Sequence, residues 1–560
     1  MIENLSLTNY KAFEKENLDI KPITILLGTN SSGKSSIIQF LLMLKQTINN
    51  VNDYESALKL NGKFVNLGEV ENIFRNKNTN KNLRFSLQFN ISQKNHFFTE
   101  FNFLKRSMEN DIIDLHYRLT QLDERFNSIT NQRHFFSTKN FKDIDTSNIF
   151  LVIKDVKRLK KKYLKEDLDI FFKNYKLSNK TFSKNIRFQK EEIKELLISK
   201  NINEIEDSYF FIDQVSNKIS GEINIEYEIR RNKKNDLLEV VELCWKNSSQ
   251  ILLKFSIKYN KGHKKYILES DLIESKILEK YRVEFGKSIK FEKLSIIPSA
   301  DTPINQLFRR KLYNKNYFCN NTFNIFSLLN RILSSNFSID KINYISPLRA
   351  FPKRYYFLDE SNISNSLDSI DGDSITETLK KHSSLISKVN LWFEKFGLSV
   401  GVEDVKEVIH RLKINQNGLS LDITDVGFGI SQVLPIIVQG FLSKPDSLTI
   451  IEQPEIHLHP MMQSELADLF IDIVADKSQS KKLLIETHSE SLLKRLRRRI
   501  AEGKINNNDV AIYFIQGSKK KTTSARIQKL EVSSRGSFDW PIEFYSTDLE
   551  DTTEFLKHQI

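Results

Sequence analysis

A short stretch near the N-terminus has the residue types and spacing of a loop that binds phosphate. Residues 22–36 read PITILLGTNSSGKSS, which fits the pattern GxxxxGK[ST]. Glycines let the backbone turn its N–H groups toward a phosphate, and a following helix N-terminus adds partial positive charge. The pattern predicts that the Lys34 ammonium reaches the β- and γ-phosphates of a nucleoside triphosphate and that the Ser35 hydroxyl holds Mg²⁺. The loop residues that we expect to bind the nucleotide are Gly28, Asn30, Ser31, Ser32, Gly33, Lys34, Ser35 and Ser36.

Two flanking elements must position this loop. The apolar run 23–27 predicts a buried strand, and apolar residues at helical spacing from 37 to 44 predict a helix, so the loop joins a strand to a helix N-terminus. Residues 2–7 and 13–20 predict two short strands that lead into it. From the turn region between them, Lys11 or Phe13 could lie against the adenine.

Carboxylates follow later apolar strands. Leu448–Ile451 predicts a short strand that ends at Glu452, in EQPEIHLHP, and 483–485 predicts another that ends in Glu486-Thr487-His488-Ser489. We expect the strand of Glu452 to neighbour the phosphate loop, where its carboxylate would bind the nucleotide's Mg²⁺ directly or through water. Strands and helices alternate again up to residues 510–514, which predicts a parallel α/β sheet with active groups at the carboxyl ends of its strands.

Three other groups could carry chemistry. Residues 425–432, DVGFGISQ, form a glycine-rich turn before an apolar helix, and Ser431 at this helix start is a second potential anion site. The loop that holds Arg349, Lys353 and Arg354 could face phosphate. His457 and His459 could suggest a metal, but a site needs more ligands than one dipeptide repeat, so a loop of the nucleotide site is favoured.

Composition limits the class of protein. The length of 560 residues predicts more than one domain. The net charge of +13 suits a polyanion such as DNA, but a lysine-rich proteome explains it equally well. With only Cys244 and Cys319, we expect neither a disulfide framework nor a cysteine zinc site. We see no signal-peptide pattern and no apolar span, so we expect a cytoplasmic protein without membrane association.

The chain divides into four predicted parts. Residues 1–96 and 341–516 carry the motifs, whereas 97–340 consist of helical stretches rich in Lys, Asn and Glu, broken by strand-like alternation, which we interpret as one large insertion. Residues 517–560 form a tail. The basic runs 160–162 and 309–311 could touch nucleic acid or a protein, although a solvated helix face is the favoured interpretation.

The motifs together resemble a known family. The blocks GTNSSGKSS, DVGFGISQ, LTIIEQPEIHLHP and LLIETHS, in this order, resemble the ABC-type ATPases of the SMC, RecF and OLD branch, particularly OLD-like proteins of bacterial defence systems. The resemblance covers 1–90 and 343–516. It implies an α/β fold: an ABC-type P-loop head, split in sequence, with a mostly parallel sheet core, an antiparallel N-terminal lobe and a large mixed helical and strand insertion.

The family also implies how such heads work. Two heads sandwich ATP and Mg²⁺ in a homodimer or a higher oligomer. By resemblance, Gly429 and Ser431 would contact the γ-phosphate bound to the opposite subunit, 457–460 would be the D-loop, and His488 would be the switch histidine.

This sequence departs from the family at the position of the catalytic carboxylate. Gln453 follows Glu452 where the family has a second acidic residue, and an amide can orient water but cannot accept its proton. Either Glu455 is the base, or hydrolysis is slow and ATP acts mainly as a dimer clamp. A Q-loop glutamine is not evident, and Asn66 and Glu69 are the nearest candidates.

The biological role has two main interpretations. Many OLD proteins carry a Toprim nuclease after the head, but the stretch after His488 is short, so we expect no nuclease in this chain. The layout resembles Septu-like defence ATPases, which work with a separate HNH nuclease, and this favours an ATP-dependent switch that controls an effector in anti-phage defence. The alternative is a DNA-repair or DNA-clamping ATPase like RecF or SMC. A metabolic P-loop kinase is disfavoured by the signature-like block.

Overall fold

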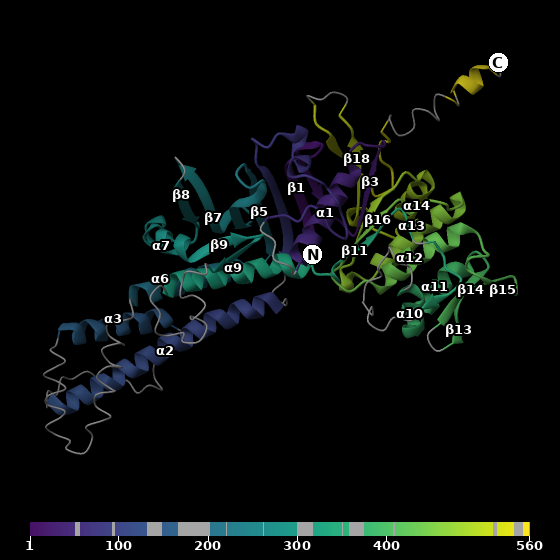
Figure 1. Ribbon diagram of the computed structural model, residues 1–560. Coiled ribbons are helices and arrows are strands. Elements are labelled where there is room, and N and C mark those ends of the chain that lie inside the picture. The colour runs from purple at the N-terminus through teal and green to yellow at the C-terminus, as the bar shows by residue number, and fades with distance from the viewer. Residues whose placement is uncertain are drawn as a thin grey trace. The chain divides into compact units, whose positions relative to one another are not determined.

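The computed structural model describes most of the chain, and its contacts divide the chain into two compact units (Figure 1). The first unit consists of Met1–Asn90, Glu226–Val240 and Leu333–Ile560, and the second of Ile91–Ile225 and Val241–Ile332. The four-part division expected from the sequence stays a prediction. The described residues are 1–50, 56–91, 96–130, 148–165, 202–219, 221–260, 263–298, 317–349, 351–357, 374–406, 409–518, 523–541, 551 and 553–558.

A six-stranded sheet forms the centre of the first unit, in the order β11-β16-β17-β3-β18-β19. All neighbours from β11 to β18 are parallel, and β19 is antiparallel to β18. Every residue of β3 and β17 is buried, as expected for parallel strands covered on both faces. The predicted α/β class is therefore confirmed. The strands are β3 (Ile23–Gly28), β11 (Ile342–Ile345), β16 (Leu448–Glu452), β17 (Lys482–Glu486), β18 (Val510–Gln516) and β19 (Arg526–Leu530).

The order of these strands corrects one expectation. β17 lies between β16 and β3, so the strand of Glu452 does not neighbour the strand of the phosphate loop. The neighbour is the strand of Glu486, which is in register with Leu26 on one side and with Glu452 on the other. Order along the chain could not show this, because each parallel connection must cross over and can insert its strand anywhere in the sheet.

Helices α1, α12, α13 and α14 pack beside this sheet. The predicted helix after the phosphate loop is α1, which begins at Lys34. On β3, Ile23, Ile25 and Leu27 belong to one core with residues of the other three helices, among them Val433 and Leu492. The helices span α1 (Lys34–Ile48), α12 (Phe428–Leu442), α13 (Pro460–Val474) and α14 (Glu490–Ala501), and two shorter ones are α10 (Ser374–Lys381) and α11 (Ser383–Glu394).

Antiparallel strands complete the first unit. The two predicted strands near the N-terminus are β1 and β2, which pair as a hairpin, and β4 pairs with β1 on its other side. The predicted hairpin is also present over the described residues 409–422, while Val408 lies outside them, and its turn residues Asn417 and Gly418 both have positive φ. These strands are β1 (Ile2–Tyr10), β2 (Phe13–Asp19), β4 (Leu83–Ile91), β12 (Tyr356–Phe357), β13 (Leu398–Lys406), β14 (Ile409–Gln416) and β15 (Leu419–Asp422).

The strand β19 was not predicted. We expected residues 517–560 to form a tail, but Arg526–Leu530 pairs with β18. Because β19 is the last strand of the sheet and only Leu530 is buried, its composition resembles that of a loop.

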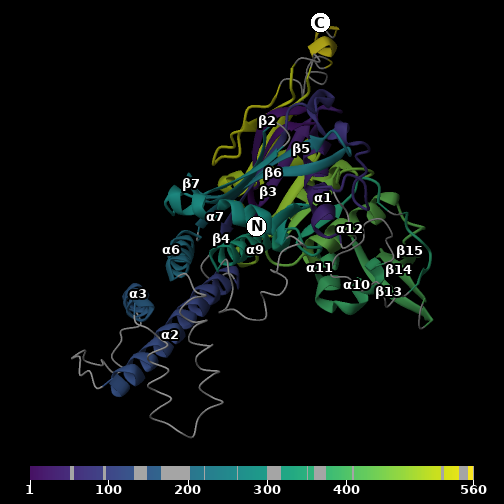
Figure 2. The same cartoon turned by 60° about the vertical axis from the view of Figure 1, so that its left-hand side comes forward.

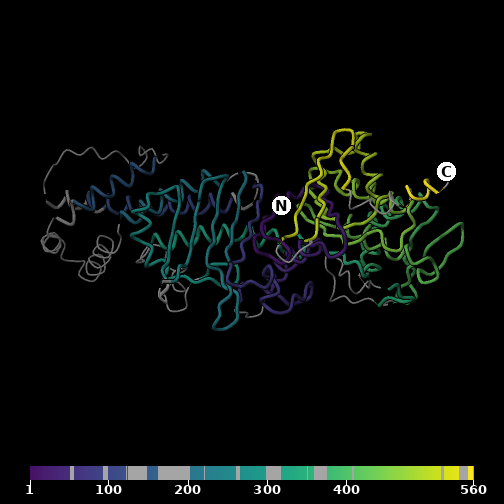
Figure 3. The backbone as a smooth tube through the Cα atoms, turned by 90° about the horizontal axis from the view of Figure 1, so that it is seen from above, coloured from purple at the N-terminus to yellow at the C-terminus, as the bar shows by residue number. Residues whose placement is uncertain are grey.

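Within the described residues, the second unit contains the helices α2, α3, α6 and α7, most of α9, and an antiparallel sheet. Figure 2 shows the helices α2, α3 and α6 of this unit. Side chains join them in pairs, for example Lys105 on α2 with Asp213 on α6, and His116 on α2 with Asp155 on α3. In the sheet β6 pairs with β7 and β7 with β8 (Figure 3). Its elements are α2 (His96–Thr130), α3 (Ile149–Lys165), α6 (Ile202–Lys218), β7 (Gln250–Asn260), β8 (His263–Glu269), α7 (Ser275–Ser288), β9 (Ile289–Glu292) and β10 (Ser295–Pro298), while β5 (Gly221–Asn232), β6 (Leu237–Asn247) and α9 (Tyr317–Asn336) are divided between the units.

Of the two basic runs, Lys160 and Lys161 lie on α3. The run 309–311 lies outside the described residues.

Candidate nucleotide site

The loop between β3 and α1 requires glycine at two positions. Gly28 has φ 147°, and a Cβ atom there would lie 2.4 Å from the carbonyl oxygen of Ile515. Gly33 has φ 115°, and its Cβ would lie 3.1 Å from Cζ of Phe13. Other residues rarely adopt such φ values, so the two glycines of the motif are explained by backbone conformation and close packing.

Lys34 is buried beside this loop. Its ammonium donates hydrogen bonds to the carbonyl oxygens of Gly28 (3.0 Å) and Thr29 (2.9 Å) and lies 3.9 Å from a carboxylate oxygen of Glu486. Burial lowers the pKa of Lys34, and the Glu486 carboxylate opposes this shift. The positive charge therefore lies between the loop backbone and the end of β17.

Ser35 also faces Glu486. Its hydroxyl oxygen lies 3.2 Å from Oε2 and 3.5 Å from Oε1 of this carboxylate, which is 4% exposed. Burial raises the pKa of Glu486, while Lys34 and Ser35 lower it. Glu486 was expected at a strand end but without a role in the site. The available signal was an acidic residue that ends an otherwise apolar strand.

Glu452 lies one strand further along the sheet. Its carboxylate accepts a hydrogen bond from the Tyr344 hydroxyl at 2.9 Å, and Tyr344 belongs to β11, on the side of β16 away from β17. Burial and the nearby Glu486 raise the pKa of Glu452 to about 7. No motif in the sequence indicated a role for Tyr344, so it is a second residue of the site that sequence reasoning missed.

Glu455 and His488 are brought together, although they lie on different connections. The Glu455 carboxylate accepts hydrogen bonds from the Thr487 hydroxyl (2.8 Å) and from the backbone N–H of His488 (2.7 Å). Burial raises the pKa of Glu455, and these donors oppose the shift. Burial and the charge of Lys34 lower the pKa of His488, which favours its neutral form. Among the described residues, the buried His488 Nε2 has no hydrogen-bond partner.

Gln453 has a constrained backbone. Its φ is 44°, its N–H donates to the carbonyl oxygen of Glu486 at 2.7 Å, and Arg349 Nη2 donates to the carbonyl oxygens of Glu452 (3.0 Å) and Gln453 (3.2 Å). The Arg349 side chain is buried, and this burial lowers its pKa to about 10. Of the three basic residues in this loop, Arg349 thus reaches the strand end, whereas Arg354 pairs with Asp422 and Asp425.

Gly429 and Ser431 lie in the first turn of α12, against the segment that follows β16. A Cβ at Gly429 would lie 2.6 Å from the carbonyl oxygen of His457, and the rings of Phe428 and His457 meet edge to face at 4.9 Å. The Ser431 hydroxyl donates to the carbonyl oxygen of Phe428 at 2.7 Å. The two sequence blocks are therefore packed on one another.

His459 lies at the start of α13. Its Nδ1 accepts a hydrogen bond from the N–H of Met461 and so caps α13. Within the described residues, no group of three or more His, Cys, Asp or Glu side chains could hold a metal ion.

The residues expected near the adenine lie close to the loop but make other contacts. Phe13 is fully buried beside Gly33, and Lys11 donates a hydrogen bond to the Gln39 side chain at 2.6 Å. Within the loop, Ser32 is 2% exposed, and its hydroxyl has no partner among the described residues. Asn30 and Ser31 are exposed, and the Ser36 N–H donates to the carbonyl oxygen of Gly33.

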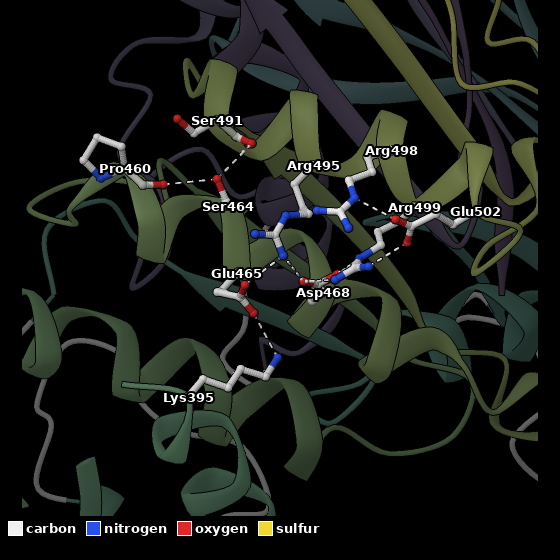
Figure 4. Close-up of polar contacts among 10 residues, drawn as sticks. All are labelled: Lys395, Pro460, Ser464, Glu465, Asp468, Ser491, Arg495, Arg498, Arg499 and Glu502. Atoms are coloured by element: carbon white, nitrogen blue, oxygen red, sulfur yellow. Dashed lines mark hydrogen bonds and ion pairs between the residues drawn. The ribbon is translucent and has the colours of Figure 1, made fainter. Parts of the chain in front are cut away.

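The helices α13 and α14, which follow the two acidic strand ends, are joined by charged side chains (Figure 4). Asp468 on α13 accepts hydrogen bonds from Arg495 and Arg499 on α14. Burial alone would raise the pKa of Asp468, but these two arginines lower it below its ordinary value. The further contacts in Figure 4 are Lys395 and Arg495 to Glu465, Arg498 and Arg499 to Glu502, and Ser464 to the carbonyl oxygens of Pro460 and Ser491.

This arrangement of a strand, a glycine loop and a helix N-terminus, with carboxylates at the ends of nearby parallel strands, is that of P-loop nucleotide-binding proteins. The chain belongs to the AAA ATPase domain family, which matches residues 1–493. Membership in this family supports nucleotide binding and ATPase activity.

Solved structures of SMC heads are similar to this chain. The SMC head domain from Thermotoga maritima has 9% identity and a TM-score of 0.34, covering 95% of this chain and 99% of its own. The Smc head domain from Pyrococcus furiosus, with an extended coiled coil and bound to the C-terminal domain of ScpA, has 10% identity and a TM-score of 0.29, covering 100% and 98%.

A search of curated proteins gives no match. Among the helices of the described residues, none has the length and apolar character to cross a membrane.

Proposed function

We propose that this chain binds ATP with Mg²⁺ on the loop Gly28–Ser36 and hydrolyses it. The observation that carries the proposal is that Lys34 and Ser35, at the start of α1, both lie beside the acidic end of β17. A lysine ammonium can exchange its bonds to the loop carbonyls for bonds to phosphate oxygens, and Mg²⁺ neutralises the charge on the β- and γ-phosphates.

The residues of the strand ends have separate roles in this proposal. Glu455 accepts the proton of the attacking water, because its carboxylate is held against the switch histidine by a hydrogen bond from the His488 backbone N–H. Gln453 orients water, and neutral His488 offers its Nε2 to the γ-phosphate or to water. Glu452 shapes the charge at this edge of the sheet through its contact with Tyr344.

We further propose that two copies of the chain form an ABC-type head dimer with ATP between them. The support is the resemblance of DVGFGISQ to a signature loop and its contact with the segment 457–460 through Gly429. Ser431 would exchange its bond to Phe428 for one to the γ-phosphate held by the partner subunit. Since α12 begins at Phe428, the helix N-terminus would favour a phosphate there.

The role that we propose for the dimer is control of a separate effector nuclease of the HNH type in anti-phage defence. It rests on the resemblance of the motif set to OLD-like and Septu-like ATPases. The second candidate is a RecF-like or SMC-like ATPase that clamps DNA, and the net charge of +13 favours it. Co-purification of an effector nuclease with the chain would support the first role. Salt-dependent DNA binding by the pure chain would support the second.

The test of nucleotide binding compares Lys34→Ala with Lys15→Ala, an exposed lysine on β2. A charge-assisted hydrogen bond contributes about 1.5–3 kcal/mol, so Lys34→Ala should weaken ATP binding about tenfold or more in calorimetry. Lys15→Ala should bind ATP like the unchanged protein. Equal ATP affinity in both variants would contradict the phosphate-loop assignment.

The test of the dimer mixes a Lys34→Ala chain with a Ser431→Arg chain. If the sites are shared between subunits, one composite site in each mixed dimer keeps both residues, and ATP hydrolysis should partly return. If proven mixed dimers stay as inactive as each variant alone, Ser431 does not act across the interface.

A further inference from the structure

We propose that Glu486, at the end of β17, is the carboxylate ligand of the Mg²⁺ that accompanies ATP, and that Glu452 is not a ligand. This inference rests on the proposed binding of ATP with Mg²⁺. The sequence motifs point to Glu452, at the end of β16, as the metal ligand. The proposal assigns this role to Glu486, at the end of β17, instead.

The first evidence is the distance between Glu486 and Ser35. The Ser35 hydroxyl oxygen lies 3.2 Å and 3.5 Å from the two carboxylate oxygens of Glu486. Mg²⁺ takes oxygen ligands at about 2.1 Å in octahedral geometry, so two ligands at adjacent corners are about 3 Å apart. The Ser35 and Glu486 oxygens therefore already have nearly the separation that one Mg²⁺ requires.

The second evidence is the order of the strands. β17 is hydrogen-bonded to β3, and Glu486 is in register with Leu26, two residues before the glycine that begins the loop. Glu452 is in register with Glu486 but belongs to the next strand, and its carboxylate accepts its bond from Tyr344 on the far side of β16. The carboxylate nearer to the loop hydroxyl is thus that of Glu486.

The third evidence is the charge of the buried side chain. A carboxylate that is 4% exposed needs a cation or several donors, because burying an unpaired charge is costly. Lys34 and Ser35 supply these contacts in the structure. When Lys34 turns to the phosphates, a divalent cation next to Ser35 would take over the compensation of this charge.

The experiment measures metal and nucleotide binding separately, with Mn²⁺ as the probe. We would titrate Mn²⁺ into protein with saturating ATP and record the free ion by electron paramagnetic resonance, and measure ATP affinity by calorimetry in excess chelator. The variants are Glu486→Gln, Glu452→Gln and, as a matched control, Glu490→Gln in the first turn of α14, where the half-buried carboxylate pairs with Lys494.

For Glu486→Gln we expect two opposite effects. Mn²⁺ affinity should fall about tenfold or more, because even second-shell partners of a metal contribute about 10- to 100-fold. ATP affinity without metal should stay equal or rise, because a negative charge beside Lys34 is removed. A residue that only supports the fold would weaken both. Glu452→Gln should weaken Mn²⁺ binding by much less, and Glu490→Gln should change neither.

The proposal is overturned if Glu486→Gln keeps the Mn²⁺ affinity of the unchanged protein, or if Glu452→Gln loses more of it. If Glu486→Gln does not fold, Glu486→Asp replaces it, because it keeps the charge and withdraws the carboxylate by one methylene. This variant should still bind ATP but lose Mn²⁺ affinity. If Glu486→Asp keeps the full Mn²⁺ affinity, the proposal is overturned as well. Failure of ATP binding in the unchanged protein, with and without metal, would instead refute the proposed function.

Discussion

Replacing Glu455 with glutamine tests which residue accepts the proton in ATP hydrolysis. The substitution keeps the size of the side chain and removes its charge. A glutamine oxygen can accept from the His488 N–H, and its amide can donate to the Thr487 hydroxyl oxygen, so both contacts of Glu455 have a replacement. The variant should therefore fold and bind ATP.

The expected loss of turnover follows from the two roles that Glu455 could have. General base catalysis contributes about 10²- to 10⁴-fold, which corresponds to about 2.7–5.5 kcal/mol of activation free energy. Replacing a charge-assisted hydrogen bond by a neutral one costs about 1 kcal/mol, or less than about tenfold in rate. A fall in kcat by about 100-fold or more would therefore identify the base.

The matched control is Thr487→Val, which removes one donor to the carboxylate but leaves its charge. We would measure steady-state ATP hydrolysis and ATP binding for both variants. If kcat decreases as much in Thr487→Val as in Glu455→Gln, Glu455 only positions the segment of Thr487 and His488. Turnover of Glu455→Gln close to that of the unchanged protein, with ATP bound, would refute the reasoning.

The pH dependence of kcat is an independent test of Glu455 as the base. A base must be ionised, so kcat should fall as pH decreases through the pKa of Glu455. An ordinary glutamate has a pKa of about 4.3. Because burial raises the pKa of Glu455, the fall in kcat should begin at a higher pH than it would for an ordinary glutamate. Glu455→Gln should lose this part of the profile.

Three further predictions follow from single contacts. Asp468→Ala removes the acceptor for Arg495 and Arg499, so thermal denaturation should show a loss of about 2 kcal/mol in the free energy of unfolding. Because the pKa of Asp468 is lowered in the folded protein, the difference between the variant and the unchanged protein should disappear as pH falls through that pKa. Gly33→Ala forces a Cβ into a left-handed conformation 3.1 Å from Phe13, so ATP affinity in calorimetry should fall, whereas Gly418→Ala, at a turn with open space, should bind ATP normally. Tyr344→Phe leaves Glu452 without its donor and should lower the midpoint of thermal denaturation, with a loss of about 1–3 kcal/mol; an unchanged midpoint would contradict the contact.

Local patterns predicted much of the first unit. The strand, loop and helix around Lys34 and the hairpin at Asn417 and Gly418 depend on residues that are close in sequence, so their spacing is informative. A two-residue turn needs positive φ at both positions, and Asn-Gly supplies it at low cost. The edge strand β19 was missed because an edge needs little apolar surface, and its N–H at Ile527 is held by Glu16, far away in sequence.

The acidic residues of the site show why its geometry could not be predicted in the same way. The sequence places Glu452 and Glu486 at the ends of two equivalent apolar strands, and nothing in their spacing from Lys34 distinguishes them. The distinction arises from hydrogen bonds between strands: β17 pairs with β3, so Glu486 meets Ser35, whereas β16 pairs with β11, so Glu452 meets Tyr344.

The same reasoning applies to the contact of Glu455 with the switch segment. β16 and β17 are in register, so the residues that follow Glu452 and Glu486 leave the sheet side by side, and the Glu455 carboxylate can accept from both Thr487 and the N–H of His488. A displacement of either segment would break these bonds, and the ion pairs of Asp468 resist such a displacement because they join the two helices that follow. The proposed base Glu455 and the proposed switch histidine His488 are therefore positioned by one set of contacts, which exists only when both strands take their places in the sheet.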